Sequence, residues 1–272
     1  MNSLAQTVET LRTPAAARRW TRLRRGVTLP LLLVASWWAA YTFGWTHSRL
    51  FVPPAEVVRT GLGMVLDGEL PNALLASLAR DLSGLAIGSL AGFGFALLLQ
   101  SSRWIDAAIA PTFHSIRQVA LFAWIPLLGT WFGLGDTGKV VFVSLAAFFP
   151  VWLNAAQGLK SVPEHYKELA EVFRFTRWQR FRRIVLPAIV PSLFNGFYLA
   201  LVTSWIATLG AEFLMTSGAG MGSVLSDGRE NYRIDQVLVG VAVVGLTGFA
   251  FHSFAASVDS LLARRRGAGA RT

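Results

Sequence analysis

The sequence predicts an all-α membrane fold in which several helices cross a bilayer one after another. The chain has 272 residues, of which 53% are hydrophobic and only 15% are charged. Its apolar runs are far longer than a soluble core needs, and roughly 20 apolar residues are enough for a helix to cross a membrane. Basic residues stand in blocks between these runs instead of forming one stripe, which favours membrane topology over nucleic-acid binding. We therefore expect a polytopic protein in a lipid bilayer, with no nucleic acid as a partner.

Residues 1–26 are expected to form a basic, cytoplasmic tail. They are polar and rich in arginine, and no small-residue cleavage pattern precedes the end of the first apolar run, so we expect no cleaved signal peptide. The first membrane helix and an external segment are expected over residues 27–71, the core of the protein over 72–266, and a C-terminal tail over 267–272. The chain has no cysteine, which excludes disulfides, thiolate metal sites and cysteine nucleophiles.

Six segments are long enough to cross the hydrocarbon core as helices. The predicted spans cover residues 27–45, 74–100, 107–132, 140–159, 184–209 and 236–262. Arg117, Gln118 and two prolines interrupt the third span, so we expect that helix to be bent or split.

The distribution of lysine and arginine predicts which side of the membrane each loop occupies. With the N-terminus inside, 18 of these residues fall in the tail and the inner loops and five fall outside. Arg80 and Arg117 lie within predicted spans. Basic residues are enriched on the cytoplasmic side of membrane proteins, so both termini are expected in the cytoplasm.

The second predicted span carries small residues along one face. Gly84, Gly88 and Gly92 follow one another at four-residue spacing, which places them on the same side of a helix. Small residues let two helix backbones approach closely. We expect this face to pack against another helix of the same chain, with a subunit interface as the alternative.

The segment 163–191 is too polar to cross a membrane and too rich in helix formers to be a plain loop, and its first part, 163–183, is expected to form the loop itself. Residues 168–172 suit a short helix at the membrane surface, and Phe173, Phe175, Trp178 and Phe181 provide apolar anchors. The physical chemistry leaves two interpretations open. The segment either lies on anionic lipid or inserts into a groove of a partner protein.

The spacing within this segment resembles a known motif. Glu168 and Ala170, followed by Ile184, Leu186 and Pro187, are similar to the cytoplasmic loop of binding-protein-dependent ABC importer permeases. The consensus of that loop is E-A-A, three residues, Gly, nine residues, Ile, one residue and Leu-Pro. Two positions depart from it: Leu169 replaces the second Ala, and Arg174 replaces the Gly that turns the chain between two short helices.

Other segments resemble the nitrate, sulfonate and taurine branch of these permeases, and the likeness covers roughly residues 72–266. They are Ala123–Leu127 (AWIPL), Trp131–Asp136 (WFGLGD), Phe148–Asn154 (FFPVWLN) and Gly220–Gly222 with Arg229-Glu230 after it.

This resemblance implies a type I importer permease fold with a coupling loop between the fourth and fifth spans. It further implies a homodimer lining one pathway, two cytoplasmic ATPase subunits that bind the loops, and an extracytoplasmic solute-binding protein. ATP and magnesium would be held by the ATPase, with no cofactor or metal on this chain. The residues implied in docking are Glu168, Leu169, Ala170, Arg174, Arg177, Leu186 and Pro187.

Polar residues within the spans are candidates for the translocation pathway, because ionisable groups in a membrane are costly and are usually paired or face a cavity. For the two arginines of this set, the alternative is a structural pair or an interfacial position. Asp81 lies beside Arg80 near the outer end of the second span, and Glu212 ends the fifth span. The pathway candidates are Arg80, Arg117, Asn154, Thr203 and Ser204.

The segment Gly133–Val140 nearly fits a phosphate-binding loop. Val140 occupies the position that needs a hydroxyl for magnesium, and an apolar span follows, so we interpret the segment as a turn. The four histidines lie far apart, with no metal-binding or catalytic spacing. No hydrolytic motif is found, so we expect a transport subunit and not an enzyme.

The predicted function is that of a permease subunit in a bacterial inner membrane, which passes a small anionic solute such as nitrate, sulfonate or taurine. The alternative solutes are cyanate and a neutral pyrimidine precursor. An ion-coupled secondary transporter is the rival interpretation. Such a transporter favours inverted repeats and an acidic site at mid-membrane, and the sequence has neither feature.

Overall fold

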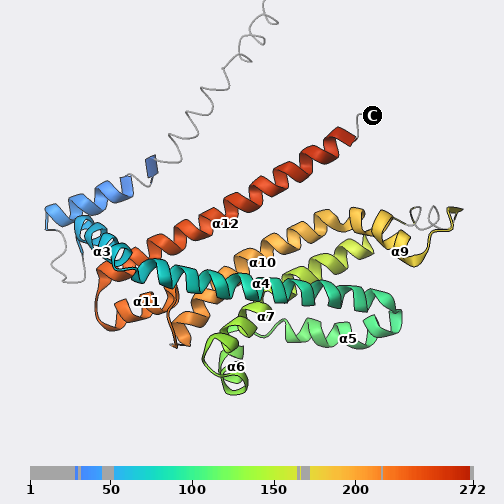
Figure 1. The fold of residues 1–272 in the computed structure, drawn as a ribbon, viewed down its shortest axis with the longest axis horizontal. Helices are drawn as coiled ribbons and strands as arrows, with labels where there is room; N and C mark the ends of the chain where they lie inside the picture. Colours follow the sequence, from blue (N-terminus) through green and yellow to red (C-terminus); the bar gives the residue numbers. More distant parts are fainter. Residues whose placement is uncertain are drawn as a thin grey trace, which may run out of the picture. The chain divides into compact units, whose positions relative to one another are not determined.

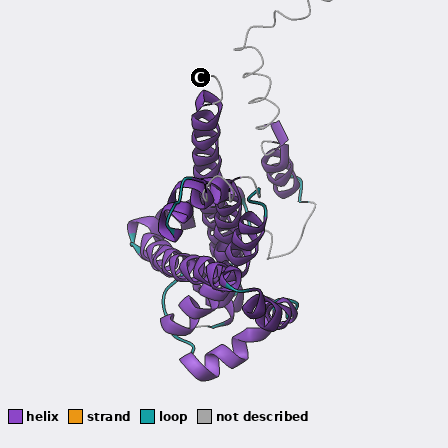
Figure 2. Ribbon diagram, turned by 90° about the vertical axis from the view of Figure 1, so that its right-hand side faces the viewer, coloured by secondary structure: helices purple, strands orange, loops and turns teal. Residues whose placement is uncertain are grey.

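The structure is a computed structural model that describes residues 28–29, 32–44, 52–163, 166, 172–215 and 217–269. Side chains are described up to Val258 and at Ser260. These parts of the chain contain helices and loops and no strand (Figure 2). The chain divides into two compact units, residues 1–60 and 61–272. The first unit contains a helix over residues 32–42 and the start of α3 (Pro54–Leu66).

Four long helices dominate the second unit: α4 (Glu69–Ser101), α7 (Asp136–Lys160), α10 (Leu186–Leu214) and α12 (Ile234–Gly269) (Figure 1). Within the described residues, four helical stretches are long and apolar enough to cross a membrane; they contain α4, α7 and α10 and residues 234–258 of α12. They confirm the second, fourth, fifth and sixth predicted spans. The first predicted span begins and ends outside the described residues, and its described parts, residues 28–29 and 32–44, include the helix over residues 32–42.

Shorter elements connect the long helices. They are α5 (Arg103–Ile116), the 3-10 turn η1 (Leu121–Trp124), α6 (Ile125–Phe132), α9 (Arg177–Arg180), the π-helix η2 (Phe181–Val185) and α11 (Met221–Glu230).

The prediction of one span over residues 107–132 is wrong as a continuous helix, although its split was expected. α5 ends at Ile116, residues 117–120 form a turn, and the chain restarts as η1 and then α6. Pro111 lies inside α5 without breaking it. Pro126 stands in the first turn of α6, where its missing N–H costs nothing. Arg117 therefore caps α5 and is exposed, instead of lying within a span.

The glycine face of α4 packs against α7 of the same chain, which confirms the intrachain interpretation. A Cβ added at Gly88 would lie 2.2 Å from the carbonyl oxygen of Ser144, and one at Gly92 would lie 2.6 Å from that of Phe148. No side chain fits at such distances. The two backbones therefore approach one another at a separation that only glycine allows.

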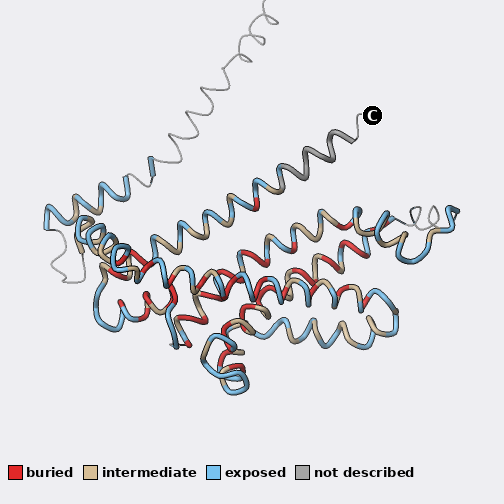
Figure 3. The backbone as a smooth tube through the Cα atoms, viewed as in Figure 1, coloured by how far each residue is buried: buried red, intermediate tan, exposed pale blue. Residues whose placement is uncertain are grey.

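The buried core lies where α4, α7 and α10 run side by side (Figure 3). Trp152 of α7 is 1% exposed and packs with Ala96 of α4 and Ile189 of α10. Phe95, Phe113 and Phe148 surround its ring at centroid distances of 5.3 to 6.1 Å. These contacts tie the three helices and α5 into one body, while much of α12 stays exposed.

Local sequence features set the ends of the long helices. Gly68 adopts a left-handed conformation (φ 77°) directly before α4, which few other residues tolerate. α7 has Asp136 in its first turn and Lys160 in its last turn. Both charges match the helix dipole, which favours anions at the N-terminus and cations at the C-terminus.

Candidate functional site

A buried cluster of charges joins four elements at the end of the bundle where α10 finishes. We call it the glutamate hub, and it comprises Ser77, Arg80, Asp136, Glu212 and the backbone amides of Met221 and Gly222. The Arg80 Nη1 donates to Glu212 Oε1 at 2.6 Å, and its Nε donates to Asp136 Oδ1 at 2.7 Å. Glu212 is fully buried, whereas the Asp136 side chain is 71% exposed. The Arg80–Glu212 pair is therefore shielded from water, where ion pairs are strongest.

The first turn of α11 closes over the Glu212 carboxylate. Gly222 N–H donates to Glu212 Oε2 at 3.0 Å, and Ser77 Oγ donates to the same oxygen at 2.7 Å. Ser77 Oγ in turn accepts from Met221 N–H at 2.8 Å. A carboxylate at a helix N-terminus is stabilised by the unpaired N–H groups and by the helix dipole. The hub thus fixes α11 onto α4 and α10.

Glycine is required where α11 meets the hub. A Cβ added at Gly220 would lie 2.5 Å from the Glu212 carboxyl carbon, and one at Gly222 would lie 2.6 Å from the Leu209 carbonyl oxygen. Any side chain at either position would push α11 away from α10. The glycine-rich stretch is therefore explained by close packing on the buried carboxylate.

Two further buried groups extend the hub. Lys139 of α7 is 0% exposed, and its Nζ donates to the carbonyl oxygen of Ser217. The lysine of the near-phosphate-loop motif therefore holds another loop of the protein. On the other side, Thr208 Oγ1 donates to Asp81 Oδ1 at 3.1 Å, and both residues are buried. Within the described residues, Asp81 Oδ2 has no hydrogen-bond partner.

The five predicted pathway residues do not form one cluster. The charge of Arg80 is compensated by two carboxylates of the hub, as the structural-pair alternative expects. Arg117 is exposed at the end of α5. Thr203 Oγ1 donates to the Leu199 carbonyl at 2.9 Å, and the buried Ser204 Oγ donates to the Leu201 carbonyl at 3.2 Å. Both hydroxyls are thus satisfied by protein groups, and Thr203 Oγ1 also lies 3.3 Å from the Ala146 carbonyl oxygen of α7.

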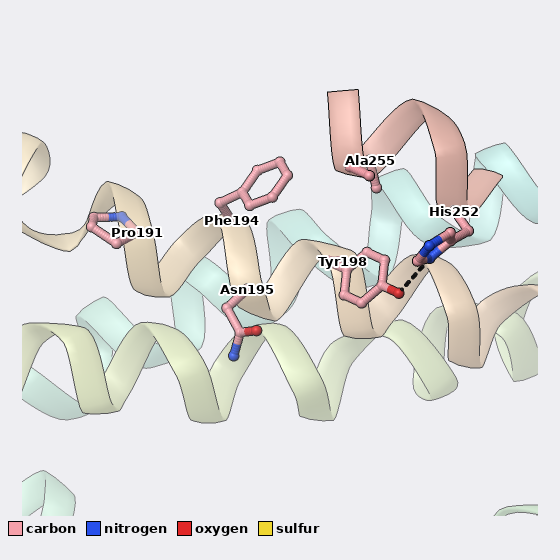
Figure 4. A pocket seen from close by; sticks show the side chains of 7 residues that line it. Pro191, Phe194, Asn195, Tyr198, His252 and Ala255 are labelled. Atoms are coloured by element: carbon pink, nitrogen blue, oxygen red, sulfur yellow. Dashed lines mark hydrogen bonds between the residues drawn. The ribbon is translucent and has the colours of Figure 1, made fainter. Parts of the chain in front are cut away.

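The fifth pathway candidate belongs to a polar face on α7, α10 and α12. Asn195 Nδ2 donates to Asn154 Oδ1 at 2.7 Å, and Asn154 Nδ2 donates to the Pro150 carbonyl at 2.9 Å. One turn further along α10, the Tyr198 hydroxyl is 2.8 Å from His252 Nδ1 of α12 (Figure 4). Asn195 and His252 are exposed on the protomer. A polar face therefore runs along helices that are otherwise apolar.

The opposite end of the bundle contains the predicted docking loop. Glu168, Leu169 and Ala170 lie outside the described residues. Arg174, which replaces the consensus glycine, adopts the left-handed conformation with φ 49°. The chain therefore makes a glycine-type turn with a non-glycine residue, which costs conformational energy.

The chain becomes helical again directly after this turn. Thr176 and Gln179 form a capping box, in which each side chain bonds to the backbone N–H of the other residue. Arg177 is the first residue of α9, and α9 continues through the π-helix η2 into α10. Leu186 and the exposed Pro187 stand in the first turn of α10. The second half of the loop is therefore a rigid extension of α10.

Aromatic and basic side chains surround a hollow beside this extension. The rings of Phe173 and Phe175 stack with centroids 5.8 Å apart, and the Arg183 guanidinium lies 5.6 Å from the Phe175 ring. A cavity of about 320 Å³ is lined here by Tyr166, Arg183, Ile184, Pro187 and Ala188.

Sequence reasoning missed several residues that the structure brings together. It noted Arg80 and Asp81 near one end of the second span and Glu212 at the end of the fifth, but it did not bring them together or pair them with Ser77 or Asp136. It found no metal-binding or catalytic spacing around the histidines, His252 among them, and did not single out Tyr198. A usable signal was present, because Arg80 and Glu212 are charged residues placed at the same predicted depth in two apolar helices.

Comparison with known proteins gives a consistent result. Residues 84–267 match the family model described as binding-protein-dependent transport system inner membrane component. The taurine transport system permease protein TauC of Escherichia coli is 30% identical over 241 residues, which cover 85% of this chain and 86% of TauC. The nitrate import permease protein NrtB of Synechocystis is 27% identical over 249 residues, which cover 88% and 89% of the two chains. Permeases named for aliphatic sulfonates and for bicarbonate are also similar.

A solved structure supports the fold. The crystal structure of an amino acid ABC transporter with histidines superposes with a TM-score of 0.57. The match covers 75% of this chain and 97% of the solved chain, at 22% sequence identity. At that identity the likeness shows the fold, which is that of a type I importer permease.

Proposed function

Since the chain belongs to the family of binding-protein-dependent transport system inner membrane components, we propose that it forms the translocation pathway of an ATP-driven importer and leaves ATP hydrolysis to a partner. The chain is a multi-pass membrane protein and a transport permease subunit. The observation that carries the proposal is the docking loop. Its motif spacing, left-handed turn and rigid connection to α10 occur together.

The proposed mechanism connects the loop to the helices. An ATPase subunit binds Glu168, Leu169 and Ala170 in a groove, with Arg174 and Arg177 at its rim and Leu186 and Pro187 at the base. Because α9, η2 and α10 are continuous, a displacement of the loop is carried into α10 as a rigid-body motion. The π-helix η2 lies at the junction, and π-helical turns are frequent at functional sites. ATP and magnesium belong to the ATPase in this proposal.

The orientation follows from the position of the basic residues. The loop end of the bundle carries Arg177, Arg180, Arg182 and Arg183, so we place this end, together with both termini, in the cytoplasm. The glutamate hub then lies on the extracytoplasmic side, where the solute-binding protein delivers its cargo. The bound partners in the membrane are lipid and a second copy of the permease.

The polar face of α7, α10 and α12 supports a homodimer with a central pathway. Asn195 and His252 are exposed on the protomer within helices long enough to cross the membrane. Polar side chains at that depth are costly against lipid and are favoured against a water-filled pathway or another helix. Of the pathway candidates, Asn154 belongs to this face, Thr203 and Ser204 follow along α10, and Arg80 and Arg117 lie away from it.

The solute is proposed to be a small anion such as a sulfonate, taurine or nitrate, in a bacterial inner membrane. The similar proteins are named for taurine, nitrate, aliphatic sulfonates and bicarbonate, and all of these carry oxyanion groups. The attraction of the protein for the anion has to be moderate, because a site that binds the solute tightly slows its release.

The proposal is tested by co-purification of an affinity-tagged chain from detergent-solubilised membranes. An ATPase subunit is expected to accompany the unmodified chain. Glu168→Lys is expected to abolish this association while membrane insertion is retained, because the substitution reverses the charge within the docking motif. Glu230→Lys provides the matched control, since Glu230 is exposed at the end of α11 and lies on the opposite side of the bundle. Full assembly and uptake by the Glu168→Lys variant would refute the docking role.

A further inference from the structure

We infer that the cavity between α10 and α12 is a membrane-embedded binding site for a small organic oxyanion of the aliphatic sulfonate type. The cavity measures about 340 Å³ and is lined by Pro191, Phe194, Asn195, Tyr198, His252, Ala255 and Ala256 (Figure 4). The inference rests on the proposed function and deepens it, because it locates a solute site and narrows the class of solute.

The depth of the cavity in the membrane is that expected of a binding site along the translocation pathway. Asn195 is nine residues into α10, and His252 is eighteen residues into α12. At 1.5 Å per residue, they lie about 14 Å and about 27 Å from the starts of these antiparallel helices. Both residues are therefore inside the hydrocarbon region, in the half nearer the docking loop.

The polar edge of the cavity offers neutral hydrogen-bond donors. When the Tyr198 hydroxyl donates to Nδ1 of a neutral His252 ring, the hydrogen of that ring is on Nε2, which can donate to a ligand. The Asn195 amide uses one N–H on Asn154 and retains a second donor. Among the residues whose side chains the structure describes, those that line the cavity carry no carboxylate, ammonium or guanidinium group. Donors without a fixed charge favour an oxyanion that is held weakly enough to be released.

The remaining walls select for an apolar portion of the solute. Pro191, Phe194, Ala255 and Ala256 contribute carbon surface to the same lining. The volume is at the lower end of the range for small-molecule pockets, about 300 to 1,000 Å³. An inorganic oxyanion such as nitrate or bicarbonate would leave most of this space and all of the apolar surface unused. A short alkyl chain with a sulfonate head uses both surfaces.

The test is a ligand-observed NMR titration of the permease purified with its ATPase in lipid nanodiscs. Butane-1-sulfonate is the probe, and nitrate and bicarbonate are the comparison anions. The unmodified chain should bind the sulfonate saturably and more tightly than either inorganic anion. Tyr198→Phe should weaken binding by about tenfold through loss of the ordered His252 donor. Ala256→Leu should abolish binding, because the added side chain occupies the cavity from its exposed rim.

Thr247→Val is the matched control, since Thr247 is a polar residue of α12 that bonds to the Val243 carbonyl and does not line the cavity. This variant should bind the sulfonate as the unmodified chain does. The inference is overturned if the unmodified chain does not bind the sulfonate, if nitrate or bicarbonate binds equally well, or if Tyr198→Phe and Ala256→Leu leave the affinity unchanged. If the unmodified chain co-purifies with its ATPase but does not bind the sulfonate as expected, the solute site is wrong and the proposed function stands. If no ATPase co-purifies with the unmodified chain, the proposed function itself is contradicted.

Discussion

At one end of the bundle, Arg80 and Glu212 are buried and paired with each other, whereas at the other end the basic residues after Phe173 are largely exposed. The first end joins α4, α7, α10 and α11 through hydrogen bonds from the Arg80 and Ser77 side chains and from the adjacent backbone amides of Met221 and Gly222. The second end has few such bonds among the described residues and contains a strained turn at Arg174.

This difference indicates that charge serves two purposes in one protein. Buried charges that satisfy one another hold elements at fixed positions, because separating them exposes each to the full cost of burial. Exposed charges and aromatic rings on a helical extension remain available to a partner. The hub is thus suited to hold the helices together while the ATPase subunit displaces the loop end. Substitutions at the two ends should therefore separate stability from assembly.

The largest expected effect is at the hub. Glu212→Ala leaves the Arg80 charge buried without its shielded partner and removes the acceptor of the Ser77 hydroxyl and the Gly222 amide. Breaking a buried pair by removing one partner typically costs about 3–5 kcal/mol. The free energy of unfolding in mixed detergent micelles should fall by roughly this amount.

Asp136→Asn is the control for the hub, because it alters the other carboxylate that contacts Arg80. Its side chain is largely exposed, and exposed ion pairs contribute about 1 kcal/mol or less. Equal losses of stability in the two variants would refute the distinction between a buried and a screened pair.

A smaller effect of opposite sign is expected at the loop. Arg174→Gly removes the steric cost of the left-handed turn, which is about 1–2 kcal/mol for a non-glycine residue. Glycine also makes the unfolded chain more flexible, which offsets about 0.4–1 kcal/mol of that gain. The same unfolding measurement should show a net stabilisation of no more than about 1.6 kcal/mol.

Arg177→Gly tests whether this gain comes from the turn. Arg177 is an exposed arginine three residues later, at the start of a helix with ordinary backbone angles, so glycine there should destabilise the protein slightly. The same sign of change in both variants would contradict the assignment of strain to Arg174.

Sequence patterns predicted the features that depend on short-range spacing. The glycine repeat of α4, the long apolar helices and the loop motif all follow from residues within one segment. The turn at residues 117–120 was anticipated as a bend, but its extent was not, because prolines in α5 and α6 are both accommodated in helices. Arg174 replaces the consensus glycine and nevertheless adopts the left-handed backbone conformation that a glycine would have there.

The hub and the cavity could not be predicted because their contacts join residues far apart in the chain. Ser77 and Glu212 are separated by 135 positions, and Tyr198 and His252 by 54. A single sequence gives the depth of each residue in the membrane but not which helices are neighbours. The face that Asn195 shares with His252 becomes visible only when α10 and α12 are packed together.

The most direct test of the account is a cross-linking experiment that exploits the absence of cysteine from the chain. Ala170→Cys introduces one thiol into the docking motif, and Asp227→Cys introduces one on an exposed position of α11 at the hub end. A short heterobifunctional maleimide reagent is applied to membranes that contain the assembled transporter. A covalent adduct with the ATPase subunit is expected from position 170 and none from position 227. Absence of the adduct at 170, or equal adducts from both positions, would contradict it.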